Sequence, residues 1–188
     1  MPRRGLNRAT VVETAAVLAD TRGVERLTLA SVAERLGVSS PSLYNHVSGL
    51  DGLRREVALF GLANLSARLA RATMGKVRGD AVLALTDAYR SFARERPGLY
   101  ALIVLRPPEQ ADDELWRAGQ ESVALALAAL AGFGLSADEA MHATRALRAL
   151  VHGFVALETS GGFGVPLDLD ESFQRMVRTF VGALERHG

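Results

Sequence analysis

Residues 28–53 read TLASVAERLGVSSPSLYNHVSGLDGL, and their pattern is the most informative one for the structure of the N-terminal part of the chain. Apolar residues at positions 29, 32, 33 and 36 recur at helical spacing and form one stripe over two turns. Gly37 then suits the left-handed backbone of a tight turn. Ser39 or Ser40 can cap a second short helix, in which Pro41 takes a tolerated first-turn position. The stretch therefore predicts two short helices joined by a tight turn, a helix-turn-helix.

The second helix of this pair has an unusual composition. Around one buried-type residue, Leu43, it carries serines, a tyrosine, an asparagine and a histidine. Hydroxyl, amide and imidazole groups can pair with base edges in the major groove, whereas a core helix has no use for so many short polar side chains. The composition indicates a helix that reads DNA. Two alternatives stay open: Tyr44 as a core aromatic, and His46 as a brace between this helix and the next.

The rest of the chain reads as helix after helix, without a convincing strand. Helices are expected over about 8–22, 48–72, 80–95, 112–132, 136–159 and 170–186, with a brief apolar segment over 99–105. Asn7 and a Ser136–Glu139 capping box mark two of the starts, and the glycine-rich stretch 160–166 reads as a loop. We therefore expect an all-α fold of about nine helices. Residues 1–47 would form the helix-turn-helix domain, residues 48–72 a connecting helix, and residues 73–188 a larger C-terminal bundle.

Composition excludes several classes of protein. The chain has no cysteine, so it has no disulfide scaffold, thiol nucleophile or thiolate metal site. Its longest uncharged run, residues 122–137, is shorter than the ~20 apolar residues of a spanning helix, and no secretory signal is visible. A soluble cytoplasmic protein is the expectation. The net charge of +1 says little about nucleic acid, but Arg3 and Arg4 in the basic N-terminal arm are candidate phosphate contacts.

Residues 36–47, LGVSSPSLYNHV, closely resemble the recognition segment of the tetracycline-repressor (TetR) family. The likeness extends over about residues 7–60, which include an alanine-rich helix before a glycine and a Leu-Thr pair after it. The resemblance implies DNA-facing positions in the second helix of the pair and a phosphate contact at Thr28. The DNA-facing residues that it implies are Ser39, Ser40, Pro41, Ser42, Tyr44, Asn45 and His46.

One position departs from the family pattern. The family usually carries a lysine near the start of the fourth helix, where this chain reads Ser48-Gly49-Leu50. Either a phosphate contact is missing, or Arg54, Arg55 and the N-terminal arm replace it.

The C-terminal part resembles the family more loosely. Residues 149–154, ALVHGF, look like the Trp/Val-His-Gly motif of one C-terminal subgroup. A glycine inside a helix costs about 1 kcal/mol against alanine, so Gly153 indicates a close helix approach or room for a ligand. The resemblance implies an effector pocket in this part, mostly apolar and suited to a hydrophobic or aromatic small molecule. Its expected lining is drawn from Tyr89, Phe92, Leu99, Tyr100, Leu102, Trp116, Met141, Arg145, His152 and Phe154. Each of the aromatics, and His152, could equally be ordinary core.

A homodimer is also expected, because its twofold symmetry would match a pseudo-palindromic operator. The last two helices carry apolar stripes that need a partner surface. The expected interface residues are Leu147, Leu150, Val151, Phe173, Val177, Phe180, Val181 and Leu184.

These observations favour a ligand-responsive repressor that binds double-stranded DNA as a dimer and is released by a small effector. Activation instead of repression stays open. So do a helical enzyme and an interaction module that carries a helix-turn-helix without operator function. The enzyme alternative lacks a nucleophile elbow, a nucleotide loop and paired carboxylates, and His142, His152 and His187 do not form a recognisable metal site. No cofactor or metal is expected.

Overall fold

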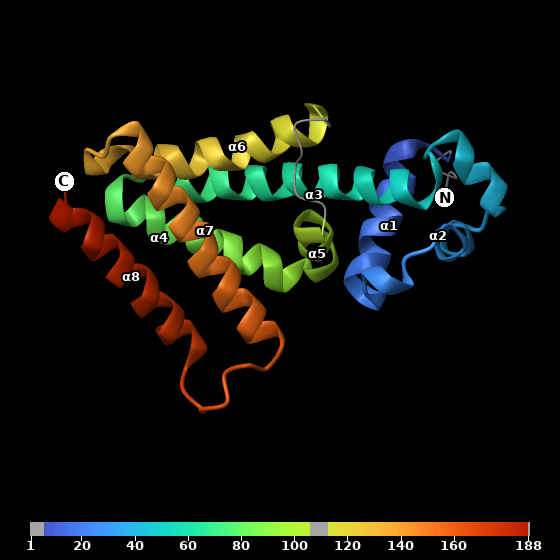
Figure 1. The fold of residues 1–188 in the computed structure, drawn as a ribbon. Coiled ribbons are helices and arrows are strands. Elements are labelled where there is room, and N and C mark those ends of the chain that lie inside the picture. The colour runs from blue at the N-terminus through green and yellow to red at the C-terminus, as the bar shows by residue number, and fades with distance from the viewer. Residues whose placement is uncertain (1–5, 106–112, 188) are drawn as a thin grey trace. The chain divides into compact units, whose positions relative to one another are not determined.

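The structure is a computed structural model that describes residues 6–105 and 113–187. All regular structure in these residues is helical, which confirms the expected all-α class. The helices group into two compact units, and Figure 1 colours them by residue number. Unit one comprises residues 1–64 and 96–118, and unit two comprises residues 65–95 and 119–188. Two helices, α3 (Gly49–Thr73) and α6 (Asp113–Leu130), contribute to both units.

The first helix of unit one begins and ends where local signals place it. The Oδ1 atom of Asn7 accepts a hydrogen bond from the Thr10 amide at 2.9 Å and so caps α1 (Arg8–Arg22). The Gly23 amide donates to the Ala19 carbonyl at 3.0 Å and ends the helix. The other described elements of this unit are η1 (Val24–Arg26), α2 (Leu29–Leu36), η2 (Ser40–Asn45), the first part of α3, α5 (Pro97–Leu105) and the start of α6.

The tight turn of the helix-turn-helix is confirmed. A capping box opens α2, in which Thr28 Oγ1 accepts from the Ser31 amide and Ser31 Oγ accepts from the Thr28 amide, both at 3.1 Å. Gly37 ends α2 with φ +67°, a left-handed conformation that a residue with a Cβ rarely adopts. These two ends fix where α2 starts and where the chain turns toward η2.

The second helix of the pair is tighter than expected. In η2, a 3-10 helix, the Ser42 amide donates to the Ser39 carbonyl at 3.0 Å and the His46 amide to the Leu43 carbonyl at 2.9 Å. Pro41 has no amide to donate, and so short a helix gains little from the α-helical pattern. Ser39 takes the N-cap position as expected, but its hydroxyl makes no capping bond to the backbone and instead shares a 2.8 Å hydrogen bond with the Ser42 hydroxyl.

The brief apolar segment predicted over 99–105 is a regular helix, α5, and it packs on α1 within unit one. Asp20, near the end of α1, accepts hydrogen bonds from the Gly98 and Leu99 amides at 2.8 and 3.1 Å. Its other carboxylate oxygen lies 2.6 Å from Arg96 Nε. Gly98 has no room for a side chain, because an added Cβ would lie 2.1 Å from the Ala19 carbonyl carbon. Asp20 thus caps α5 from a different helix.

Unit two is a bundle around α4 (Arg78–Glu95). α7 (Ala137–Thr159) and α8 (Leu169–His187) both pack on α4, and more extensively than on each other. Residues 160–168 join them as the loop that the sequence predicts (Figure 1). η3 (Ala131–Phe133) follows α6. The predicted capping box at Ser136 is present, with the Ser136 amide donating to Glu139 Oε2 at 2.8 Å.

Gly153 does not mark a close helix approach among the described residues. It is exposed on α7, and a Cβ added there would meet nothing within 4 Å. The expected domain boundaries at residues 47 and 73 stay a prediction.

In residues 6–105 and 113–187, no single helix is long and apolar enough to cross a membrane, although residues 114–133 and 137–159, a pair of helices bent against each other, have that length and apolar composition together. The same residues contain no group of three histidines or acids that could hold a metal ion.

Candidate DNA-binding and effector sites

The predicted DNA-facing residues lie in η2 and directly beside it, and the exposed ones within η2 are Pro41, Tyr44 and Asn45. Leu43 is completely buried and anchors this short helix, while the neighbouring Tyr44 is 63% exposed and Asn45 is also exposed. Tyr44 is therefore not a core aromatic. A phenol and an amide side by side on an exposed helix can donate and accept hydrogen bonds at once, as base edges require.

The serines of η2 are held in place before any DNA arrives. Ser39 is exposed and Ser42 half-buried, and the hydrogen bond between their hydroxyls spans the exposed Pro41. Ser40 is half-buried. A hydroxyl that is already oriented loses less conformational entropy on binding than a free one. Both serines keep further hydrogen-bonding capacity, because each hydroxyl can donate once and accept twice.

Thr28 and His46 flank this surface. Thr28 is exposed, and its oxygen accepts the cap bond from Ser31, which leaves the hydroxyl proton available to a phosphate oxygen. His46 is half-buried, so a brace and a phosphate contact both stay compatible with its position.

Of the basic residues expected to replace the missing lysine, Arg55 is engaged inside unit one. Arg55 Nη1 lies 3.3 Å from Glu56, and Arg55 Nη2 lies 3.0 Å from Glu114 at the start of α6. Arg8 donates to the same Glu56 through Nε at 2.9 Å. Arg54 Nε is buried and has no hydrogen-bond partner in the described part of the chain. A DNA phosphate would have to compete with Glu56 and Glu114 for Arg55. These ion pairs therefore argue against Arg55 as the phosphate contact that replaces the missing lysine. Arg3 and Arg4 lie outside the described residues.

The ten predicted effector-contacting residues are divided between the two units. In unit one, Leu99, Tyr100 and Leu102 are buried on α5, and Trp116 is half-buried on α6. The sequence offered no sign that α5 is tied to α1 through Asp20, because the two residues that bond it lie 78 and 79 positions along the chain.

In unit two, Phe92 on α4 is almost fully buried, with the guanidinium of Arg68 5.8 Å from its ring centre. Phe154 on α7 is buried against Phe163 and Phe173, with ring centres 4.8 and 5.1 Å apart. The remaining residues are Tyr89, Met141 and His152, which are half-buried, and Arg145, which is exposed. Arg145 therefore does not line the interior of its unit.

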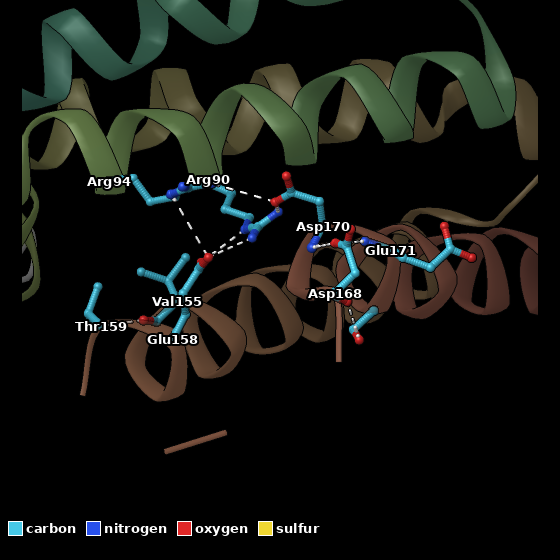
Figure 2. A network of polar contacts seen from close by, with 9 residues as sticks. Arg90, Arg94, Val155, Glu158, Thr159, Asp168, Asp170 and Glu171 are labelled. Carbon is cyan, nitrogen blue, oxygen red and sulfur yellow. Dashed lines mark hydrogen bonds and ion pairs between the residues drawn. The ribbon is translucent and has the colours of Figure 1, made fainter. Parts of the chain in front are cut away.

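An ion-pair network centred on the buried Arg90, which sequence reasoning missed, lies beside Phe154, and its charged residues are shown in Figure 2. Arg90 on α4 donates to both carboxylate oxygens of Glu158, at 2.9 Å from Nε and 2.6 Å from Nη2. Its third nitrogen, Nη1, lies 2.8 Å from Asp170 Oδ1. The hydrogen bond with Glu158 raises the pKa of Arg90 above its ordinary value, despite burial, so the guanidinium stays charged.

The predicted dimer residues are for the most part already covered by their own chain. Leu150, Phe180 and Leu184 are half-buried, while the other five, Leu147, Val151, Phe173, Val177 and Val181, are buried. The exposed positions of α7 also include small side chains and one leucine, which lie among the exposed His142, Arg145 and Arg148. The small residues and the leucine are Ala146, Ala149, Gly153, Ala156 and Leu157.

Comparison with known proteins assigns both parts of the chain. Residues 11–57 match the family described as "Bacterial regulatory proteins, tetR family", and residues 82–180 match "Tetracyclin repressor-like, C-terminal domain". The chain is 36% identical over 96% of its length to the uncharacterized HTH-type transcriptional regulator Rv0681 of Mycobacterium tuberculosis, of which the match covers 83%. It is 35% identical over 97% of its length to the uncharacterized HTH-type transcriptional regulator YobS of Bacillus subtilis, of which it covers 95%.

A solved structure shares the fold. It is a single-substitution variant of TetR from Acinetobacter baumannii AYE in complex with minocycline, with a TM-score of 0.72, 22% identity, and coverage of 96% of this chain and 97% of that chain. The two family matches and the two relatives point to the same family, and the helix-turn-helix of the structure is consistent with it. The chain belongs to the TetR family of bacterial transcriptional regulators, which bind DNA through a helix-turn-helix and are not enzymes.

Proposed function

We propose that this regulator is a repressor that binds a pseudo-palindromic operator as a homodimer and releases it when a small apolar or aromatic effector binds. The observation that carries the proposal is the exposed polar side of η2, where Tyr44 is 63% exposed beside Asn45 and the completely buried Leu43 holds the helix in place. Since DNA is the partner, the cytoplasm is the compartment that fits it.

On the DNA, η2 would lie in the major groove and Thr28 would contact a phosphate. Each good bidentate contact between a side chain and a base is worth about 1–3 kcal/mol of discrimination. The phosphate contacts of Thr28 and of the N-terminal arm would add affinity for any sequence, with a steep dependence on salt.

A second copy of the chain would supply the second recognition helix. Two half-sites one helical turn apart need recognition helices about 34–36 Å from each other, which a twofold dimer provides. We place the interface on α7 and α8, with the half-buried Leu150, Phe180 and Leu184 at its centre and the small exposed side chains of α7 beside them. The five buried residues predicted for the interface would support it from behind.

The effector half of the proposal rests on the family and on the composition of the candidate lining. The Acinetobacter structure is named as a complex with minocycline, so one protein of this fold holds a small organic molecule. A lining rich in aromatic and aliphatic side chains suits an apolar or aromatic effector. An effector weakens operator binding only by its differential affinity for a conformer that binds DNA poorly.

Selection from random duplexes followed by substitution tests the DNA-binding half. Tyr44→Ala with Asn45→Ala should lower affinity for the selected operator by about 1–3 kcal/mol per lost base contact, without a change in thermal stability, because both side chains are exposed. Ser91→Ala, at an exposed position on α4, is the control. If the double variant still selected the same operator with wild-type affinity, η2 would not be the reading element.

Sedimentation and fluorescence test the dimer and the effector. Phe180→Glu should give a monomer with greatly weakened operator binding, and a wild-type monomer at micromolar concentration would contradict the dimer. Trp116 is the only tryptophan, so its fluorescence should change when an effector binds near it. If no apolar or aromatic compound in a broad screen lowered operator affinity, the proposed effector response would be contradicted, while the proposed operator binding would be unaffected.

A further inference from the structure

The burial of Arg90 within a helical bundle carries a cost in desolvation free energy. Its side chain is only 8% exposed, and that of Glu158 only 12%. Removing two charges from water costs free energy that their attraction recovers only in part, and apolar residues of similar volume often stabilise a protein as well or better. Stability alone therefore does not account for a buried arginine with two acidic partners in unit two.

The bonds of Arg90 join three helices at one point. Arg90 lies on α4, Glu158 lies in the last turn of α7, and Asp170 lies in the first turn of α8. Because α7 and α8 pack chiefly on α4, their position relative to each other is set through α4, and Arg90 bonds to both. Arg94 approaches the same two carboxylates more loosely, at 3.9 and 3.6 Å, and its side chain is 53% exposed.

The surroundings of Arg90 constrain its side chain. Its guanidinium carbon lies 5.2 Å from the ring centre of Phe154 and 4.8 Å from that of Phe173, and these two ring centres are only 5.1 Å apart, so both rings contact the guanidinium from one side while its nitrogens bond the carboxylates. Phe163, from the loop between α7 and α8, stacks on Phe154. A guanidinium held by fixed hydrogen bonds restricts sliding and rotation of the helices, whereas apolar contacts alone are non-directional.

We propose that Arg90 is a positioning residue for self-association: it fixes α8 against α7, and thereby shapes the surface that a second copy of this chain recognises. The inference rests on the proposed homodimer. It differs from a purely stabilising role, because it predicts that fold stability and dimer affinity can be separated.

The separating experiment replaces the ion pair by apolar residues of similar volume, Arg90→Met with Glu158→Leu. Asp170, whose side chain is 75% exposed, keeps its contact with water. Thermal unfolding of the double variant, measured for both proteins at a concentration below the dimer dissociation constant so that association does not contribute, should occur at or above the wild-type temperature, while the dimer dissociation constant from sedimentation rises at least tenfold. Arg90→Lys keeps the positive charge but cannot donate in parallel to both carboxylate oxygens of Glu158, so it should also weaken the dimer. Arg94→Ala is the matched control and should change the dissociation constant less than twofold.

A rescue experiment covers the case in which the double variant fails to fold. Arg90→Ala leaves a space between two aromatic rings and two carboxylates that methylguanidinium at millimolar concentration can enter. Dimer affinity should recover at least fivefold with methylguanidinium and not with an equal concentration of sodium ion.

The outcomes separate this inference from the proposed function. A monomeric wild-type protein at micromolar concentration removes the homodimer and this inference with it. A dimeric wild type, with a folded double variant whose dissociation constant lies within twofold, leaves the homodimer intact and overturns the inference. Failure of rescue in Arg90→Ala, where the double variant does not fold, overturns it as well.

Discussion

Gly98→Ala tests the contact between α1 and α5, because helix propensity and the structure predict opposite signs. Alanine is favoured over glycine in a helix interior by about 1 kcal/mol, so propensity alone predicts stabilisation. At position 98, however, the new Cβ would lie 2.1 Å from the carbonyl carbon of Ala19, and 2.4 Å from both its oxygen and the Asp20 nitrogen. These are backbone atoms, which cannot rotate away as a side chain could.

The expected magnitude follows from the distance that the helices must move. Relief of the clash needs a separation of about 1.4 Å, because ordinary carbon contacts begin at about 3.5 Å and the new Cβ would lie at 2.1 Å. That movement stretches the 2.8 and 3.1 Å bonds from the Gly98 and Leu99 amides to Asp20 beyond useful length. Overpacking costs about 1–3 kcal/mol, and a lost hydrogen bond to a charged group about 1.5–3 kcal/mol. Against the gain in propensity, we expect a net destabilisation of about 2–4 kcal/mol.

Thermal and urea unfolding measure this effect. For a chain of this length the unfolding temperature should fall by roughly 5–15 °C, since 1 kcal/mol corresponds to about 2–4 °C. Gly182→Ala in α8 is the control: its Cβ would meet only Arg186 Nη1 at 3.6 Å, and stability should stay level or rise. Combined with Asp20→Ala, the loss from Gly98→Ala should be less than additive, since both changes break the same bonds. A neutral or stabilising Gly98→Ala would refute the close approach of α1 and α5.

Three further changes have defined outcomes. Thr28→Ala removes the cap of α2 and should cost about 1 kcal/mol of stability, together with a salt-dependent loss of operator affinity. Ser136→Ala removes the equivalent cap of α7 and should lower stability without that loss of affinity. The hydrogen bond from Arg68 lowers the pKa of Glu95, so this pair stabilises the fold above the ordinary glutamate pKa of about 4.3 and loses that effect as the pH falls further. In Glu95→Gln, the unfolding temperature should therefore change less with pH over that acid range. Gly153→Ala should stabilise the isolated chain by up to about 1 kcal/mol and weaken the dimer if α7 meets a second copy, which sedimentation at several concentrations would show.

The elements that the sequence predicts correctly are those with local causes. The start of α1 depends on Asn7, and the turn after α2 depends on Gly37, and in both cases the partner atoms lie within a few residues. The 3-10 form of η2 was not predictable in the same way, because a six-residue segment shows no period that separates a 3-10 helix from an α-helix.

Long-range bonds explain what sequence reasoning missed. Arg90 and Glu158 lie 68 positions apart, and neither belongs to a recognisable motif. The dimer residues show a different limit. Helical periodicity identified apolar faces on α7 and α8, but periodicity cannot tell whether a face is covered by its own chain or by a partner. Val177 is 1% exposed in the single chain, whereas Phe180 on the same helix is half-buried.

The bond between Asp20 and α5 bears on how an effector could act. Leu99, Tyr100 and Leu102, three of the predicted effector contacts, lie on the helix that Asp20 holds against α1, within the unit that also carries η2. An effector that displaced α5 would therefore have to break the bonds of Asp20 or move α1 along with it. Movement of α1 would alter the support of the recognition helix, because α1 packs on α2 and α2 packs on η2, so such an effector would act on the DNA-reading unit itself. The change that the effector causes in the free energy of operator binding cannot exceed the difference between its binding free energies for the two positions of α5.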